Sequence, residues 1–232
     1  MSITAQQTSV LTTLGLANAP VAMAFVETPP TGLAQVDRAQ PAGCAYWREA
    51  SKGRAFYTAA DDHTGCPVGA FTHGVALSEN QTRELQSLVG TMIELRYLKS
   101  EEVPRIPHRA GALRFAAYAP LGGAVFEPDV VIFRGNARQI MLLSEAARGA
   151  GVFDAGAVMG RPACAMVPQT LNAGSAIASL GCIGNRVYTG LTDDELYITV
   201  PGAAVGRVLE ELETVLTANA ALEQYHRGQN GL

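Results

Sequence analysis

The 232-residue sequence predicts an α/β or α+β fold, in which helices flank a mixed sheet. Short apolar runs typical of strands alternate along the chain with amphipathic segments typical of helices. Hydrophobic residues make up 48% of the chain and charged residues only 16%, which is sufficient for a sizeable core. Two stretches also resemble each other, which suggests two pseudo-duplicated halves. We therefore expect one globular domain over residues 1–232, with internal halves at 14–120 and 121–218 and a polar, frayed tail at 219–232.

In the first half, helix and strand signals follow one another along the chain. A short amphipathic helix is expected to end within residues 15–18, and Cys44 begins a second helix. The longest helical candidate covers residues 79–98, although Gly90 weakens it. Apolar runs predict strands at Val21–Val26, Arg54–Ala59 and Leu113–Tyr118.

The second half contains the clearest single elements. Val130–Phe133 is an almost wholly apolar run, typical of a strand that is buried on both faces. Asn136 can cap the helix that follows, which ends at the glycines around residue 150. The strand Leu196–Val200 leads through a Pro-Gly turn into a last helix, whose apolar residues from Val205 onward recur with a 3.6-residue period.

Charge and hydropathy exclude several classes of partner. Seventeen basic residues against 21 acidic ones give a net charge of −4, which argues against nucleic acid or anionic lipid. The N-terminal sequence lacks an export signal, and no run reaches the roughly 18 apolar residues of a membrane-spanning helix. We therefore expect a cytoplasmic protein. In a reducing compartment, its four cysteines are expected to be ligands, nucleophiles or core residues rather than disulfides.

The four cysteines lie in two similarly built segments. In the first, the strand at 21–26 is followed by Cys44 and then by Cys66 in a Gly-Cys turn. In the second, the strand at 130–133 is followed by Cys164 and then by Cys182 in a Gly-Cys turn. If the segments are duplicates, each brings one cysteine at a helix start and one in a turn toward a shared centre. Chance is the alternative, because short matches of Gly, Ala and Cys are common in such a chain.

The surroundings of the cysteines suit an inorganic cluster, although no Cys-x-x-Cys motif is present. The glycines beside Cys66 and Cys182 let the backbone close around a bulky ligand and point its N–H groups at sulfur. The helix start at Cys44 is expected to favour the thiolate. Four apolar or aromatic neighbours could shield a cluster from water: Tyr46, Trp47, Met166 and Ile183.

Two plainer interpretations compete with ligation. Free cysteines are often simply buried, as small hydrophobic side chains, and spacing alone gives this interpretation equal weight. His63 lies three residues before Cys66, a spacing compatible with joint ligation. A histidine in a loop beside two aspartates is more often solvated, however, so we expect His63 to be exposed.

Several motifs together resemble the domain of unknown function 169 family, from about Leu14 to Leu216. They are Pro20–Phe25, Cys44 with Arg48–Ala50, Gly65–Ala70, Phe126–Phe133, Cys164, Ser179–Gly184 and Asp193–Gly202. The family has no assigned function, and its occurrence among anaerobic prokaryotes, including methanogens, fits oxygen-sensitive chemistry. Its pattern places cysteine at all four cysteine positions of this chain, which favours a shared metal site over buried thiols. His63 is not part of the pattern.

The leading hypothesis is an iron–sulfur protein whose [4Fe–4S] cluster is held by Cys44, Cys66, Cys164 and Cys182. Four thiolate ligands would suit electron transfer or redox sensing, whereas three would leave an open iron for catalysis, so the sequence leaves enzymatic activity open. The partner would be a redox protein or a small-molecule substrate. Two alternatives remain: a zinc-stabilised protein that binds a small molecule, and a metal-free enzyme with an activated thiolate at Cys44.

Overall fold

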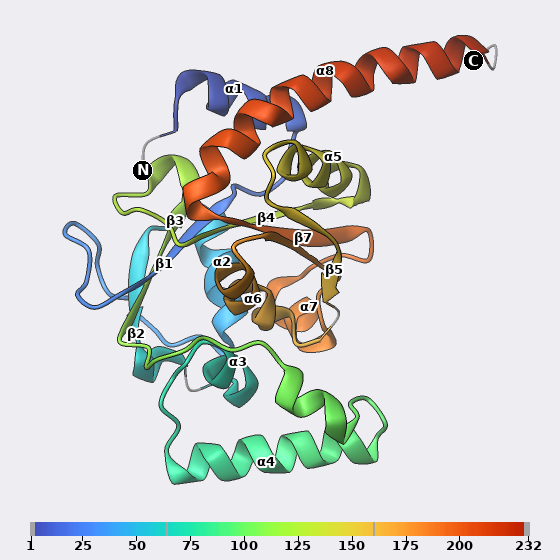
Figure 1. Ribbon diagram of the computed structural model, residues 1–232. Helices are drawn as coiled ribbons and strands as arrows, with labels where there is room; N and C mark the ends of the chain where they lie inside the picture. The colour runs from blue at the N-terminus through green and yellow to red at the C-terminus, as the bar shows by residue number, and fades with distance from the viewer. Residues whose placement is uncertain (1–2, 64, 160, 230–232) are drawn as a thin grey trace.

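The computed structural model describes residues 3–63, 65–159 and 161–229, with the backbone alone for 154–159. In this part of the chain, seven strands form one sheet in the order β2-β3-β1-β4-β7-β6-β5, with helices on both faces (Figure 1). The strands are β1 (Val21–Val26), β2 (Phe56–Ala59), β3 (Phe115–Pro120), β4 (Val130–Asn136), β5 (Phe153–Met159), β6 (Ala176–Ser179) and β7 (Glu195–Pro201). All neighbours are antiparallel except β5, which is parallel to β6. The predicted mixed sheet with flanking helices is confirmed.

The strand order is symmetric about the central β1–β4 pair. Outward from β1 come β3 and β2, and outward from β4 come β7 and β6, with each neighbouring pair antiparallel. Chain order matches as well, since β1, β2 and β3 correspond to β4, β6 and β7. Strand β5 lies at the edge without a counterpart. A duplicated chain would produce this arrangement, and the expected boundary between the halves falls between β3 and β4.

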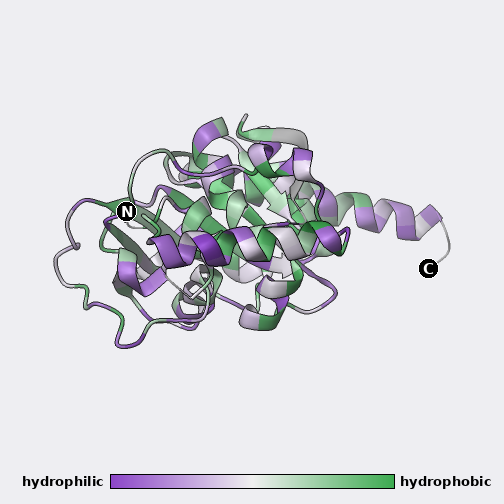
Figure 2. Cartoon of the chain, turned by 90° about the horizontal axis from the view of Figure 1, so that it is seen from below, coloured by the Kyte–Doolittle hydropathy of each residue, from purple (hydrophilic) through white to green (hydrophobic). Residues whose placement is uncertain are grey.

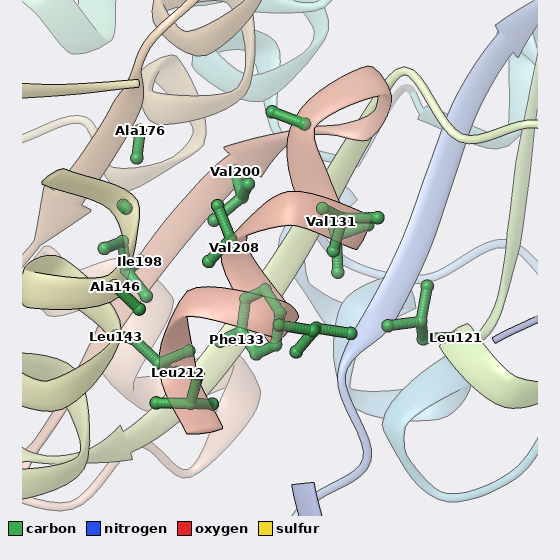
Figure 3. Close-up of a cluster of buried hydrophobic side chains, with 14 of the residues drawn as sticks. Leu121, Val131, Phe133, Leu143, Ala146, Ala176, Ile198, Val200, Val208 and Leu212 are labelled. Atoms are coloured by element: carbon green, nitrogen blue, oxygen red, sulfur yellow. The ribbon is translucent and has the colours of Figure 1, made fainter. Parts of the chain in front are cut away.

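One face of the sheet is covered by α1 (Ala5–Leu14), α5 (Ala137–Gly149) and α8 (Val205–Gln229). Figure 3 shows the core beneath them, where Val131 and Phe133 of β4 meet Leu143 of α5 and Leu212 of α8. All four side chains are fully buried. Burial of a side chain of this size contributes about 1.5–3 kcal/mol, so this face supplies much of the stability of the fold.

Local signals explain where these helices begin and end. Thr4 and Gln7 form a capping box at the start of α1, which ends at Gly15 in the left-handed conformation (φ +71°). Asn136 caps α5 as predicted, together with Gln139. The expected fraying after residue 218 is wrong for the described residues, because α8 continues to Gln229 and its end projects from the body (Figure 1). Alanines at this end favour the helix even though little packs against it.

The opposite face is covered by α2 (Gly43–Ser51), α3 (Pro67–Thr72), α6 (Met166–Ala173) and α7 (Ile183–Thr189). Helix α4 (Glu79–Glu94) lies outside this layer and contacts α3 (Figure 1). Seen from the side of α4, that helix carries both hydrophilic and hydrophobic residues, whereas the elements behind it are mostly hydrophobic (Figure 2). Short 3₁₀ turns complete the chain: η1 (Ala60–His63), η2 (Ser100–Arg105), η3 (Leu121–Gly123), η4 (Ala163–Ala165) and η5 (Gly202–Ala204).

Differences from the predicted elements are mostly at their ends. The helix expected at 79–98 ends at Glu94, and Arg96 then takes the left-handed conformation (φ 55°). The apolar run at 130–133 is part of a longer strand and is buried on both faces, as expected, with Val130 and Ile132 facing the second layer. Strands β5 and β6 and helices α3 and α7 were not predicted, and α6 was expected only as the helix start at Cys164 that a duplication would produce. Among the described residues, no helix combines the length and the apolar character that crossing a membrane would require.

Candidate functional site

The four cysteines come from four elements of the second layer. Cys44 is the second residue of α2, Cys66 and Cys182 are the N-caps of α3 and α7, and Cys164 lies in η4, which leads into α6. Helix α2 packs against both α3 and α7, and α3 packs against η4. The predicted pairing of a helix-start cysteine with a Gly-Cys turn in each half is therefore present. Cys44 and Cys164 are buried, Cys66 and Cys182 are half-buried, and all four are free thiols.

The thiols also influence one another electrostatically. Burial is the main cause that raises the pKa of Cys44 to about 12, and the nearby Cys182 and Cys66 sulfurs contribute to the same rise. Burial likewise raises the pKa of Cys164, to which the sulfurs of the other three cysteines add. The pKa of Cys66 is raised by burial and, more weakly, by Cys182. Since every pair of the four is coupled in this way, they share one neighbourhood.

The two Gly-Cys turns present backbone N–H groups to sulfur, as predicted. Gly69 donates to Cys66 Sγ and Asn185 donates to Cys182 Sγ, each at 3.5 Å. Gly65 is needed for close approach, because a β-carbon there would lie 2.8 Å from two backbone carbonyl oxygens. Gly181 is needed for its left-handed conformation (φ +75°). The equivalent turns therefore require glycine for different reasons.

The expected activation of Cys44 by its helix start is wrong for the metal-free thiol. Cys44 does lie in the first turn of α2, but only 7% of it is exposed. Desolvation of the charged form outweighs the helix dipole, so the pKa rises to about 12 instead of falling. Without a positively charged partner, Cys44 is protonated at neutral pH.

Three of the four predicted shielding residues surround the site as expected. Tyr46, Trp47 and Met166 are almost fully buried in the same cluster as Cys44 and Cys164. Ile183 is the exception: 65% of it is exposed, because it occupies the outward side of the first turn of α7. The prediction that Ile183 shields the site is therefore wrong.

Two histidines that the sequence did not assign to the site, His63 and His73, are buried in the cysteine layer. His63 is only 1% exposed, so the expectation of a solvated loop histidine is wrong. Its Nε2 lies 2.8 Å from the Thr58 hydroxyl. Since that hydroxyl donates to the carbonyl of Ala116 at 3.3 Å, it accepts from Nε2–H, which leaves His63 Nδ1 as an unprotonated acceptor. Burial lowers the pKa of His63 to about 3.

His73 is fully buried as well, and burial lowers its pKa to about 4. Its ring lies beside the Cys164 backbone, but neither nitrogen forms a hydrogen bond of good geometry among the described residues. The Nδ1 atoms of His63 and His73 face the same point, 3.4 and 3.6 Å from where a β-carbon on Gly43 would stand. The spacing of His63 to Cys66 was the single sequence signal for this pair.

Unpartnered polar atoms are concentrated in this layer. Within the described residues, the buried side-chain atoms without a hydrogen bond are Trp47 Nε1, His63 Nδ1, His73 Nδ1 and Nε2, Tyr118 Oη, Gln169 Oε1, and Asn185 Nδ2 and Oδ1. All belong to elements on the cysteine side of the sheet. Buried polar groups nearly always have partners, so such a set indicates a site completed by bound water, an ion or a cofactor. Among the described residues, no group of three or more His, Cys, Asp or Glu side chains is arranged to hold a metal ion.

Comparison with known proteins agrees with the predicted resemblance. A family model described as uncharacterised ArCR, domain of unknown function 169 (DUF169), matches residues 10–211. The chain belongs to this family. It is also similar to an uncharacterized protein of Methanocaldococcus jannaschii, MJ0308, with 26% identity over 168 residues, which cover 69% of this chain and 70% of that protein. No solved structure matches the chain significantly.

Proposed function

We propose that this DUF169 protein binds a [4Fe–4S] cluster through Cys44, Cys66, Cys164 and Cys182 and acts in electron transfer or redox sensing. The observation that carries the proposal is the gathering of four free, mutually coupled thiols from four separate elements. Thiolate is the usual ligand of such clusters, and four of them complete the set.

The chemistry of the surrounding groups fits an anionic cluster. Backbone N–H groups already donate to Cys66 and Cys182, and such contacts stabilise cluster sulfur. The apolar wall of Tyr46, Trp47 and Met166 would exclude water. A bound cluster would also give the unpartnered amide of Asn185 an acceptor.

The spacing of ligands distinguishes a cluster from a single ion. Around tetrahedral zinc, sulfurs about 2.3 Å from the metal stand about 3.8 Å apart. In a four-iron cluster each thiolate binds a different iron, so the sulfurs lie further from one another. A cluster therefore needs a wider arrangement of the four thiols than a zinc ion does. The absence of a single-ion group among the described side chains is compatible with it.

The raised pKa values of the thiols argue against a metal-free thiolate. Because Cys44 and Cys164 are buried away from water, their thiols lose their protons at neutral pH only if a positively charged group binds at the same time. Iron in a cluster would supply that charge. A metal-free nucleophile would need a lowered pKa, which is the opposite of what burial produces at Cys44.

Anaerobic purification, followed by a visible spectrum and by iron, sulfide and zinc analysis, tests the proposal. We expect about four irons and four sulfides per chain, with broad visible absorption that bleaches reversibly on reduction. One zinc per chain without colour would favour a zinc-stabilised protein and overturn the cluster. Metal-free protein with a single fast-alkylating cysteine would favour the thiolate enzyme.

Single Cys→Ser variants then identify the ligands. Each should lose iron and sulfide if all four cysteines ligate, whereas one variant should keep its cluster if three do. Met141→Ser is the matched control, because it removes a sulfur from the exposed side of α5, on the opposite face of the sheet. Half-exposed Cys66 and Cys182 mark the edge that a redox partner or a small-molecule substrate would reach.

A further inference from the structure

A small cavity lies between helix α2 and the strands β1, β4 and β7 and is partly open to solvent. Its free volume is about 10 Å³, which is room for one oxygen-sized atom. Part of its wall is apolar, and the rest comes from polar side chains: Trp47 and Arg48 of α2, Arg134 of β4 and Tyr197 of β7. Indole and guanidinium groups only donate hydrogen bonds, so this wall favours an acceptor as its ligand.

Trp47 contributes a buried donor that lacks an acceptor. It is 2% exposed, and among the described residues its Nε1 forms no hydrogen bond. The indole packs edge-on against the ring of Tyr197, with 5.8 Å between the centroids and 77° between the planes. A buried donor without a partner costs about 1–3 kcal/mol, so a ligand that accepts from Nε1–H would be stabilised here.

Arg134 gives the cavity a fixed wall without a free charge. Its side chain is 15% exposed and forms an ion pair with Glu195 of β7. It also donates to the carbonyls of Thr189 and Gly190, at 3.2 and 2.6 Å. The carboxylate of Glu195 balances the charge of this arginine, and the two carbonyls hold its guanidinium in place.

Arg48 differs from Arg134 because its charge is not balanced. Its described contact is with the carbonyl of Tyr188, at 3.4 Å. The neighbouring carboxylate of Glu49 pairs instead with Lys52 and Arg54. Arg48 is exposed, so its guanidinium can meet a ligand that enters from solvent.

We propose that this cavity binds the carboxylate of a small organic acid, which accepts from Trp47 Nε1–H and pairs with the guanidinium of Arg48. The single charge of a carboxylate matches the one unbalanced arginine, whereas a phosphate ester brings about −1.5 to −2. One carboxylate oxygen fits the cavity, and the rest of the acid lies at its mouth. The proposal does not depend on the proposed function, because none of the four cysteines lines the cavity.

The first experiment uses Trp47 as the reporter. It is the single tryptophan of the chain, so one indole N–H resonance in a ¹H–¹⁵N NMR spectrum reports on this cavity. We expect acetate and propionate to shift that resonance downfield in a saturable manner, because a charged acceptor strengthens the hydrogen bond. The neutral analogue acetamide, and chloride at the same concentration, should shift it far less.

Substitutions then test each contact in calorimetric titrations with propionate. Arg48→Gln should weaken binding about tenfold, because it removes a charge-assisted contact. Trp47→Phe, which keeps a ring but has no N–H, should weaken binding by a similar factor. Arg83→Gln on α4, an exposed arginine outside the cavity, is the matched control and should bind as the wild type does. Because Arg48 is exposed, its substitution leaves the core intact even if Trp47→Phe does not fold.

Three results would overturn the proposal. The first is an indole resonance that neither acetate nor propionate shifts. The second is an equal shift with chloride, since the cavity would then take an adventitious ion only. The third is wild-type affinity in Arg48→Gln, which would place the acid elsewhere. Iron and sulfide contents enter none of these measurements, so the cavity and the cluster stand or fall separately.

Discussion

Helices α1, α5 and α8 bury an apolar face of the sheet, while α2, α3, α6 and α7 bury the other face together with cysteine, histidine and amide side chains. Both faces exclude water, and β4 contributes alternate residues to each. They differ in the hydrogen bonding of their buried polar atoms. Among the described residues, the buried polar side-chain atoms that lack a hydrogen bond are confined to the cysteine face. This difference indicates that the first face stabilises the fold, whereas the second keeps polar groups buried at a cost in stability.

The substitution with the largest expected effect tests whether the apolar face stabilises the fold independently of the cysteine site. Phe133→Ala removes a fully buried ring beneath α8 and should lower the free energy of unfolding by about 3–5 kcal/mol in urea titrations. Phe71→Ala on α3, where 40% of the residue is exposed, is the control and should cost far less. Folded Phe133→Ala protein should keep the iron content of the wild type. Loss of iron from the folded variant would mean that the two faces are not independent.

The cysteine face should also be the acid-sensitive one. The pKa values of His63 and His73 are lowered to about 3 and about 4 from an ordinary value of about 6.5. Below about pH 6.5 the unfolded chain binds protons at these two histidines that the folded chain excludes. Their contribution to the free energy of unfolding is therefore fully present above pH 6.5 and is lost as the pH falls toward the lowered pKa values. Two such groups give a slope of at most about 2.7 kcal/mol per pH unit.

Unfolding of the cluster-free chain between pH 7 and pH 4 measures this slope. His63→Gln and His73→Gln should each flatten it, whereas His226→Gln on the exposed end of α8 should not. The same slope in all four proteins would show that the buried histidines do not titrate as their environment requires.

Sequence reasoning succeeded on elements with strong local signals and failed where packing decides. Asn136 and the period of the last helix are local signals, and α5 and α8 were predicted from them. Strand β6 has four small or apolar residues, and α6 is short and contains Pro168. Neither segment therefore has a hydrophobic pattern that distinguishes it from the surrounding sequence. The gathering of the cysteines was predictable because the internal similarity repeated their surroundings.

The polar residues around the cysteines were not predictable in the same way. His63 follows two aspartates, a sequence that looks solvated, and the 3₁₀ turn η1 nevertheless carries it into the core. Asn185 resembles any polar residue near a turn. Burial of both is decided by the helices that pack over them, which a single sequence does not record.

At alkaline pH, Cys44 alone should produce a smaller effect on the same face, in addition to the effects of Cys66 and Cys164. The pKa of Cys44 rises from about 9 to about 12 on folding. The contribution of this thiol to the free energy of unfolding is therefore fully present below pH 9 and is lost as the pH rises toward 12. The slope for this one group is at most about 1.4 kcal/mol per pH unit. Cys44→Ala should remove it in urea titrations of the cluster-free, reduced chain between pH 8 and pH 10. An unchanged slope would mean that Cys44 ionises in the folded chain as it does in water.

The smallest expected effect concerns the end of α8, which belongs to neither face. Residues 221–229 are exposed throughout, including Leu222 and Tyr225, and the described contact that ties them to the body is the ion pair of Glu223 with Arg138 of α5. An exposed ion pair of this kind contributes about 0–1 kcal/mol. Removal of residues 222–232 should therefore change the free energy of unfolding by less than about 1 kcal/mol and leave cluster loading unchanged. Leu212→Ala, in the buried part of the same helix, should cost about 2–5 kcal/mol, because α8 stabilises the apolar face through its first half. A truncation as costly as Leu212→Ala would place the projecting end among the elements that hold the fold together.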